Sequence, residues 1–429
     1  MKQFFYTGII LLCLCLLSAC PVNNNTSDEE PDYHIPIIWK SDIQDRSGFL
    51  LITSDGTGIY VSNSINYEDI ENWEEFKINT LRLNKINHEN GEIVWSTDYF
   101  KSVFICQPVI IGNYIYLITT DNIVICIDKT TGITSARAKL AYGDLNMQIN
   151  MNYIAYKNYV YFGYSEIDAA GNTHGENYLA RFDANMIIMN GNAQVQILEP
   201  ELLWQSRYNN VIHESRPVVY DDVVYCSTMT TNGQTPVEIA GININTKEEI
   251  FYKTIGENGE APYGDGGGEY SLYAVNDILY YFGRLFTAYD LKANKQLYFI
   301  NIGVYTLPKD NYSVLYRPPT FYNNNAYYTN TLGYLFCVDG MKGKPIWSVS
   351  PKEEYSLLTN PIIYDSKVFI PHESGIRVYN PDNGQLIGVE KTIKGNGYAF
   401  NLLNGSTMIT SMFSDEYPDG QLIALDLRK

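Results

Sequence analysis

The chain has 429 residues, a formal net charge of −18, 37 tyrosines and only five histidines. It is longer than the roughly 100–200 residues of a typical domain, so repeats are sought before domain boundaries. An acidic chain repels polyanions, which argues against a nucleic-acid partner, and the abundance of tyrosine favours strands over helices.

Residues 1–19 have the pattern of a secretory signal peptide. Lys2 gives a basic start, residues 4–19 are almost wholly apolar, and the tripeptide Leu-Ser-Ala at 17–19 precedes Cys20. The apolar run of 16 residues is shorter than the ~20 residues that a membrane-spanning helix needs. A basic start, an apolar middle and small residues before a cleavage site predict export.

The residues around Cys20 resemble the lipobox of bacterial lipoproteins. The resemblance implies that Cys20 becomes the lipidated first residue of the mature protein, and the polar, Asn-rich segment 20–34 predicts a flexible tether. Pro21 stands where an Asp would resemble an inner-membrane retention signal. The resemblance therefore implies the bacterial outer membrane, with a periplasmic or a surface-facing position left open. An ordinary signal peptide with a chance cysteine is the alternative.

From residue 35 onward, short β-branched and aromatic runs alternate with clusters of Gly, Asn and Asp, which predicts many short strands joined by turns. One turn pattern begins with Asp or Asn and usually has Gly at its fifth position. The Asp or Asn side chain can accept backbone N–H groups and Gly tolerates positive φ, so the pattern predicts tight hairpins. The eight copies begin at residues 87, 128, 183, 243, 290, 339, 380 and 426, about 48 residues apart, the period of a propeller blade. The predicted hairpin residues include Asp128, Gly132, Asp290, Asp339, Gly343 and Asp426.

The position eight residues after the start of each hairpin is often aromatic. It holds Trp95, Phe251, Tyr298 and Trp347, but Ala136 and Gly388 in two copies, and Trp204 takes this role after an insertion in the third copy. The eighth copy ends before its fourth strand, and the segment 35–43 with Trp39 can supply that strand. We therefore expect an N-terminal strand to close the ring, which removes two exposed sheet edges. The predicted inter-blade docking residues are Trp39, Trp95, Trp204 and Trp347.

The stretches "CIDKTTG", "CVDGMKGKPIW" and "ALDL" resemble the PQQ-type repeat of β-propellers, whose pattern is Ala-x-Asp-x-x-Thr-Gly-x-x-x-Trp. With the lipobox and the tether, the eight copies are similar to the BamB family of propeller lipoproteins. The expected fold class is all-β, an eight-bladed β-propeller of four-stranded antiparallel blades over residues 35–429. The expected blades are 48–98, 105–140, 151–206, 214–254, 268–300, 316–350, 359–391, and 399–429 joined by 35–43.

Four cysteines remain beyond Cys20, and their positions suit a packed core. Cys126 and Cys337 stand two residues before the Asp of their hairpins, where Ala424 stands in the last copy, so this position favours a small buried side chain. Cys106 and Cys226 lie in expected strands. A disulfide between Cys106 and Cys126 is the alternative.

The sequence shows no catalytic or metal-binding spacing. The histidines are scattered, no Cys-x-x-Cys is present, and the mature chain lacks the vicinal Cys-Cys pair carried by quinone-dependent dehydrogenases of this repeat family. We therefore expect no cofactor, no metal and no enzymatic activity, because a fold does not by itself supply a function.

The resemblance to BamB implies a protein-interaction scaffold in the cell envelope, with outer-membrane barrel-assembly components as partners and a lipid anchor in the membrane. Trp73 lies in the long segment 62–79, has no role in a blade, and is the candidate partner-binding residue. Two other functions stay open at this point. One is a surface or periplasmic propeller that binds a glycan or a protein, and the other is a quinone-dependent oxidoreductase.

Overall fold

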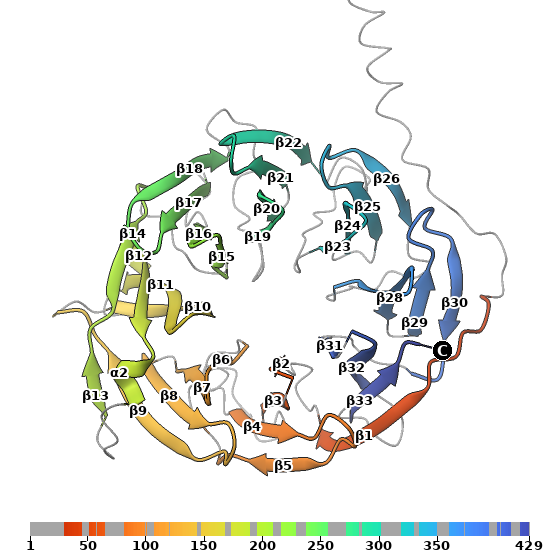
Figure 1. Cartoon of the computed structure of the whole chain (residues 1–429), viewed down its shortest axis with the longest axis horizontal. Coiled ribbons are helices and arrows are strands. Elements are labelled where there is room, and N and C mark those ends of the chain that lie inside the picture. Colours follow the sequence, from red (N-terminus) through yellow and green to blue (C-terminus); the bar gives the residue numbers. More distant parts are fainter. Residues whose placement is uncertain are drawn as a thin grey trace, which may run out of the picture.

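The described strands stand around a central axis as eight blades, with one innermost and one outermost strand in each (Figure 1). This arrangement confirms the predicted eight-bladed all-β propeller. The computed structural model describes residues 30–44, 51–56, 58–64, 81–98, 100, 107–119, 121–143, 147–167, 173–188, 195–208, 216–228, 237–255, 272–282, 285–301, 319–329, 334–349, 360–372, 374–393, 401–403, 405–412 and 421–428.

Blades 1 to 4 occupy the first half of the ring. Blade 1 contains β2 (Leu51–Ser54), β3 (Ile59–Ser64), β4 (Leu81–Ile86) and β5 (Ile93–Ser96). Blade 2 contains β6 (Val109–Ile111), β7 (Tyr114–Ile118), β8 (Ile123–Asp128) and β9 (Thr134–Leu140). Blade 3 contains β10 (Met147–Tyr156), β11 (Tyr159–Ile167), β12 (Thr173–Asp183) and β14 (Glu201–Gln205). Blade 4 contains β15 (Val218–Tyr220), β16 (Val223–Ser227), β17 (Val237–Asn243) and β18 (Glu249–Ile255).

Blades 5 to 8 complete the ring. Blade 5 contains β19 (Leu272–Val275), β20 (Ile278–Phe282), β21 (Leu285–Asp290) and β22 (Lys295–Asn301). Blade 6 contains β23 (Thr320–Tyr322), β24 (Asn325–Thr329), β25 (Leu335–Asp339) and β26 (Pro345–Val349). Blade 7 contains β27 (Ile362–Tyr364), β28 (Lys367–His372), β29 (Gly375–Tyr379) and β30 (Leu386–Glu390). Blade 8 contains β31 (Asn401–Leu403), β32 (Thr407–Met412), β33 (Gln421–Asp426) and β1 (Ile37–Gln44).

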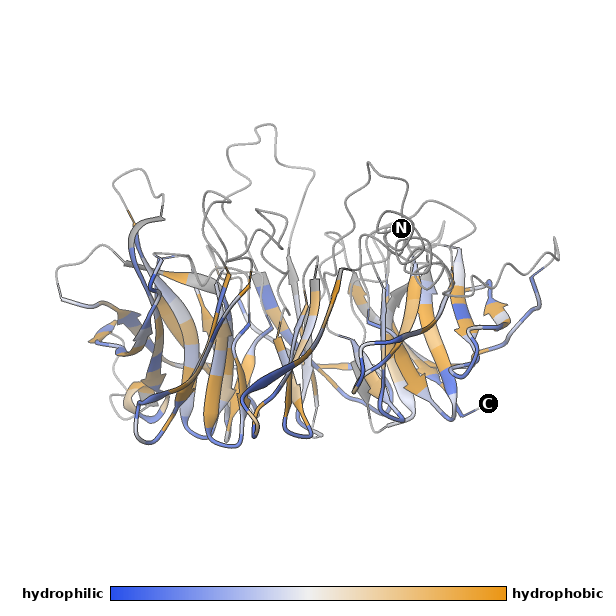
Figure 2. Cartoon of the chain, turned by 90° about the horizontal axis from the view of Figure 1, so that it is seen from above, coloured by the Kyte–Doolittle hydropathy of each residue, from blue (hydrophilic) through white to orange (hydrophobic). Residues whose placement is uncertain are grey.

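Neighbouring strands within each four-stranded blade pair antiparallel, and the turns between them have a repeated geometry. Two-residue turns with positive φ at both positions join the first and second strands, as at Asp221–Asp222 and Asn276–Asp277. Such turns match the twist of a hairpin. The outer strand pair shifts its register just before the first hairpin residue, for example between Cys337 and Val338 in blade 6. Figure 2 shows the ring from the side, with the described turns along one face and apolar residues along the strands.

The N-terminal strand closes the ring, as the sequence predicts. β1 pairs antiparallel with β33, and Trp39 stands opposite Ala424 in that pair. Because β1 and β33 come from opposite ends of the chain, blade 8 forms only when both ends meet. β1 therefore covers the edge of β33 that would otherwise be unpaired at the junction between the two ends.

Residues 30–35, called the strap below, lie against blade 7 before the chain reaches β1. The Tyr33 N–H donates to the Val389 carbonyl at 2.9 Å, and the Val389 N–H donates to the Pro31 carbonyl at 2.8 Å. Arg377 binds Glu30 at 2.6 Å, and Lys391 binds Asp32 at 2.6 Å. The structure thus differs from the expected tether over 20–34, because residues 30–34 have specific partners on blade 7.

The insertion in the third copy contributes to blade 2, although it follows a strand of blade 3. The short helix α2 (Asn185–Ile188) is followed by β13 (Gln196–Leu198), which pairs in parallel with β9. Blade 2 is therefore a five-stranded sheet. Blade 3 itself begins at Met147, earlier than the expected residue 151, because β10 extends past a register shift between Ile149 and Tyr153.

The core is formed mostly by apolar side chains packed between adjacent blades. One cluster joins Tyr327, Cys337 and Trp347 of blade 6 to Val368 and Ile370 of blade 7. Burial of this surface is the main stabilising contribution, since each blade alone exposes two apolar faces. No helix within the described ranges is long and apolar enough to cross a membrane.

The cysteines that the structure describes are core residues. Cys126, Cys226 and Cys337 are fully buried and lie outside any disulfide. Burial raises the pKa of the Cys126 thiol to about 11. The alternative of a disulfide between Cys126 and Cys106 does not agree with the free thiol of Cys126, and Cys106 itself lies outside the described residues.

Candidate functional site

The repeated hairpins place backbone carbonyls where the preceding blade can use them. Asp339 Oδ1 accepts the N–H groups of Met341 and Lys342 at 2.9 and 3.0 Å, and Gly343 closes the turn at φ +66°. Asp128 Oδ1 accepts two N–H groups in the same way, and Gly132 has φ +74°. Asp290 Oδ1 accepts the N–H of Ala293, and Asp426 Oδ1 accepts the N–H of Arg428.

Three tryptophans dock on these hairpins by the same contact. The indole N–H of Trp39 donates to the His88 carbonyl at 3.0 Å, that of Trp95 to the Lys129 carbonyl at 3.2 Å, and that of Trp347 to the Pro381 carbonyl at 2.9 Å. Each carbonyl belongs to the second residue of the hairpin in the following blade. Each ring also covers the fifth residue of that hairpin, which is Gly91, Gly132 or Gly384. A Cβ there would lie within 2.7 Å of the indole, so glycine is required both for φ and for this approach.

Two further blades use variants of the contact. Tyr298 covers Gly343, and its hydroxyl donates to the Gly340 carbonyl at 2.9 Å. Trp204 donates its indole N–H to the Glu249 carboxylate at 2.7 Å, because its partner hairpin ends in Lys247 in place of glycine. All four predicted tryptophans therefore contact a following blade, with a side-chain acceptor only for Trp204.

Two blades lack an aromatic residue at this position. In each of them another part of the chain occupies the space that the ring would fill. A Cβ on Gly388 would lie 2.9 Å from the Tyr33 Cβ and 3.0 Å from the Pro31 carbonyl oxygen, so the strap passes directly over it. In blade 2, Ala136 shares a buried cluster with Ile187 of α2, and the partly buried Leu198 of β13 packs against that cluster. The strap and the insertion thus pack where a tryptophan ring packs elsewhere.

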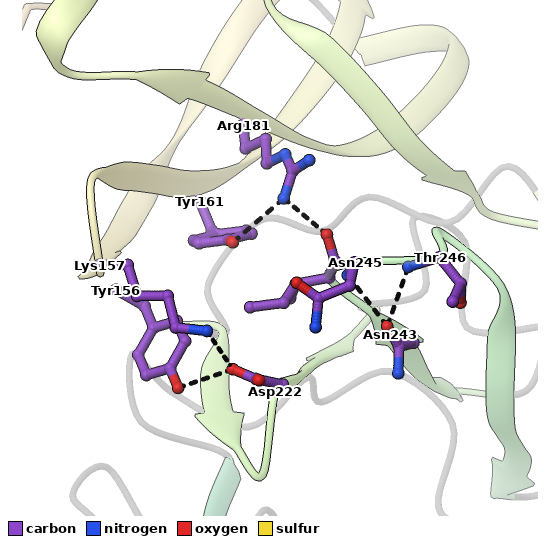
Figure 3. Close-up of polar contacts among 9 residues, drawn as sticks. Tyr156, Lys157, Tyr161, Arg181, Asp222, Asn243, Asn245 and Thr246 are labelled. Carbon is purple, nitrogen blue, oxygen red and sulfur yellow. Dashed lines mark hydrogen bonds and ion pairs between the residues drawn. The ribbon is translucent and has the colours of Figure 1, made fainter.

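A second set of inter-blade contacts joins the turns between the first and second strands. Tyr156 and Lys157 of blade 3 both bind Asp222 Oδ1 of blade 4, at 2.8 and 2.6 Å (Figure 3). Tyr220 of blade 4 binds Asp277 of blade 5 in the equivalent way, at 3.2 Å. Hydrogen bonding to Lys157 is the main cause that lowers the pKa of Asp222. This set of contacts was not predicted from the sequence, although it has a signal there: a tyrosine at the end of a first strand followed by an Asx-rich turn.

Arg181 is the central polar residue between blades 3 and 4 (Figure 3). Its guanidinium donates to the Ile244 carbonyl at 2.9 Å and to the Glu201 carboxylate at 2.6 Å. It also stands 4.3 Å from the ring centre of Tyr159. Burial acts to raise the pKa of Glu201, but hydrogen bonds from Lys247 and Arg181 outweigh it, so the pKa is lowered.

A fully buried carboxylate, Glu238, lies on the blade 4 side of the same interface. It accepts the Ser206 hydroxyl, the Arg207 N–H at 2.9 Å and the Tyr252 hydroxyl at 3.0 Å. Burial and the nearby Glu238 raise the pKa of the Tyr252 hydroxyl. These three donors satisfy the hydrogen-bonding capacity of the buried carboxylate. Because Ser206 and Arg207 follow β14 of blade 3, Glu238 holds blades 3 and 4 together.

The polar groups at these interfaces bind one another and are arranged to hold blades together. No group of three or more His, Cys, Asp or Glu that could hold a metal occurs within the described ranges. Cys20 and Trp73, the predicted lipid-attachment and partner-binding residues, lie outside the described residues. Their roles therefore stay predictions.

Eight blades, Asp-to-Gly hairpins and aromatic docking define a β-propeller of PQQ-type repeats. A family model described as "Outer membrane protein assembly factor BamB" matches residues 37–267, which is more than half of the chain. The chain therefore belongs to the BamB family of propellers. No curated protein matches the chain.

Solved structures with this fold have different functions. BamB from Moraxella catarrhalis is 14% identical with a TM-score of 0.58, over 92% of this chain and 100% of that one. The quinohemoprotein alcohol dehydrogenase of Comamonas testosteroni is 10% identical with a TM-score of 0.62, over 92% of this chain and 76% of that one. Sqt1 of Saccharomyces cerevisiae is 11% identical with a TM-score of 0.59, over 94% and 100%. Such low identities establish the fold alone.

Proposed function

We propose that this protein is a non-catalytic lipoprotein of the bacterial outer membrane that acts as a protein-interaction scaffold in the assembly of outer-membrane proteins. The observation that carries the proposal is the match of residues 37–267 to the assembly-factor family. The lipobox-like sequence ending at Cys20 supports attachment to the membrane.

The polar chemistry of the blade interfaces supports a scaffold more than an enzyme. Arg181, Glu201 and Glu238 are held by fixed partners between blades 3 and 4. A catalytic group needs an approach for substrate and a suitably shifted pKa, which these structural contacts do not supply. Because dehydrogenases share the fold, a titration of the purified protein with quinone is the direct check. Stoichiometric binding would contradict the non-catalytic assignment.

The outer strands offer surface suited to a protein partner. Exposed apolar side chains occur on β5 (Ile93 and Val94), on β18 (Ile250) and on β22 (Leu297 and Phe299). Apolar residues at the rim of a rigid scaffold are typical of binding surfaces. No described segment pairs with the outer edges of β5, β18 and β22, so a partner strand could also add there by backbone hydrogen bonds.

Affinity purification tests the proposal. The full chain with a C-terminal tag is purified from its own membranes in mild detergent, and we expect barrel-assembly components to co-purify. A matched variant, Val94→Asp with Phe299→Asp, changes two exposed side chains and should fold normally while recovering less of the partner if these strands bind it. Recovery of a folded, lipidated protein without any barrel-assembly component would overturn the proposed function.

A further inference from the structure

The strap brings the N-terminus to one particular side of the ring. Glu30 is bound to Arg377 of blade 7, and the chain then passes along β30 to β1 (red segment, Figure 1). Glu30 follows Cys20 by ten positions, a reach of at most ~36 Å when fully extended and about 17–19 Å on average for a flexible chain. A lipid on Cys20 would therefore keep the outer edge of blades 7 and 8 close to the membrane.

That edge carries exposed apolar side chains. Ile37 and Ile38 of β1 are 38% and 43% exposed, and Ile387 of β30 is 37% exposed. Ile93 and Val94 of β5 in blade 1 are exposed as well. Exposed apolar residues also occur on blades 4 and 5, so exposure alone does not single out one edge. Only the edge of blades 7 and 8 also receives the chain that comes from Cys20.

Two basic side chains of blade 7 near this edge are paired within the protein. Arg377 is bound to Glu30, and Lys391 is bound to Asp32 and to the Glu30 carbonyl. The strap therefore neutralises Arg377 and Lys391. Lys40 of β1 stays exposed beside Ile38, but a single lysine contributes only about 1 kcal/mol at an anionic membrane surface. A contact between this edge and a membrane would depend on apolar side chains and not on anionic lipid.

We infer that the outer edge of blades 7 and 8 lies on the bilayer surface, with Ile37, Ile38 and Ile387 in contact with lipid. The inference rests on the proposed lipidation of Cys20. The anchor supplies a high local concentration of membrane, and burial of these side chains at the lipid boundary then fixes one orientation of the ring. The opposite side, around β18 of blade 4, faces away from the bilayer and is free for protein partners.

Fluorescence of a single labelled cysteine tests this orientation. In a Cys106→Ser background the cysteines at 126, 226 and 337 are buried, so Ile38→Cys or Ile387→Cys can be labelled selectively with an environment-sensitive dye. Ile250→Cys is the matched control, because Ile250 is 49% exposed and lies on blade 4, across the ring from blade 8. The full-length lipidated proteins are reconstituted into phosphatidylcholine vesicles, with or without phosphatidylglycerol and with nitroxide-labelled lipid as quencher.

We expect blue-shifted emission and quenching by nitroxide lipid at positions 38 and 387, but not at 250, equally in both kinds of vesicle. Equal quenching at all three positions, or no quenching at 38, overturns the inference. Quenching that requires phosphatidylglycerol shows an electrostatic contact and overturns it as well. The mass of the N-terminal peptide, read on the same samples, separates a failed orientation from an unlipidated Cys20, in which case the lipoprotein assignment fails and the inference falls with it.

Discussion

Trp347 of blade 6 donates its indole N–H to the carbonyl oxygen of Pro381 in blade 7, at 2.9 Å, while its ring covers Gly384. The side chain is 2% exposed. It therefore combines a large buried apolar area with one hydrogen bond across the seam between two blades.

Replacing Trp347 should separate these two contributions. Trp347→Ala leaves a cavity between blades and should lower the free energy of unfolding by about 3–5 kcal/mol. Trp347→Phe keeps most of the ring and loses the N–H, so a loss of about 1–2 kcal/mol is expected. Urea unfolding at constant m-value measures both, with Ile133→Ala, at a side chain 66% exposed, as a control that should change little. Equal losses for Trp347→Ala and the control would contradict the docking role.

Gly388 and the strap provide a second test. A Cβ at position 388 would press on Tyr33, Pro31 and Asp32, so Gly388→Ala should displace the strap and cost about 1–3 kcal/mol. Limited proteolysis should then cut within residues 30–35 faster than in the parent protein. In a chain that lacks residues 30–34 the same substitution should cost almost nothing, because its steric partner is gone. A full cost in that shortened chain would show that Gly388 is needed for another reason.

The repeat made the ring predictable from sequence. Asp339 and Gly343 define a hairpin by local chemistry, and eight spaced copies of that hairpin define the blades. The strap was not predictable from its own residues. Glu30 and Asp32 are acidic residues of the kind found in a flexible tether. Their fixed positions depend on Arg377 and Lys391, which lie some 350 residues away in the sequence.

A usable signal for the strap lay elsewhere in the chain. Gly388 and Ala136 stand where other copies have an aromatic ring, and a missing ring leaves space that another segment must fill. The buried polar contacts of Arg181 and of Glu238 gave no comparable signal, because they depend on which strands of blades 3 and 4 face each other. Periodicity predicts the strands but not the polar pairs between blades.

Glu390 makes the attachment of the strap depend on pH. Its buried carboxylate accepts the Ile35 N–H at 2.8 Å and the Thr392 N–H at 2.9 Å. Burial acts to raise the pKa, but the hydrogen bond from the Thr392 hydroxyl and those from the two N–H groups outweigh it, so the pKa of Glu390 is lowered. A lowered carboxyl pKa stabilises the fold above the unfolded value of about 4.3, and this contribution is lost as the pH falls through the folded value.

Glu390→Gln should therefore lower the free energy of unfolding by roughly 1–3 kcal/mol at neutral pH, where the charged acceptor is lost. The difference from the parent protein should shrink as the pH falls below about 4. Urea unfolding of both proteins at a series of pH values from neutral to acidic measures this difference in unfolding free energy. His34 Nδ1 lies 3.3 Å from Glu390 Oε2, so the comparison is repeated in a His34→Asn background to remove that neighbouring side chain. A difference that stays constant down to the lowest pH would contradict the assigned pKa direction.

Arg181 allows a test of the polar interface between blades 3 and 4. Its side chain is 10% exposed and reaches Glu201, the Ile244 carbonyl and the ring of Tyr159 together. Arg181→Met should cost about 2–4 kcal/mol, because the Ile244 carbonyl and Glu201 lose a buried donor. Arg181→Lys should recover little of this, since an ammonium cannot provide the planar fork and the stacking of a guanidinium.

Arg207 is the matched control for that substitution. Its guanidinium also stands over a tyrosine, 3.7 Å from the ring centre of Tyr252, and pairs with Glu249, but its side chain is 52% exposed. Water can replace the contacts of an exposed arginine, so Arg207→Met should change the urea midpoint only slightly. Similar losses of stability for the two substitutions would mean that both report the removal of a surface charge. A loss confined to Arg181→Met identifies the buried contacts of Arg181 to Ile244 and Glu201 as the cause.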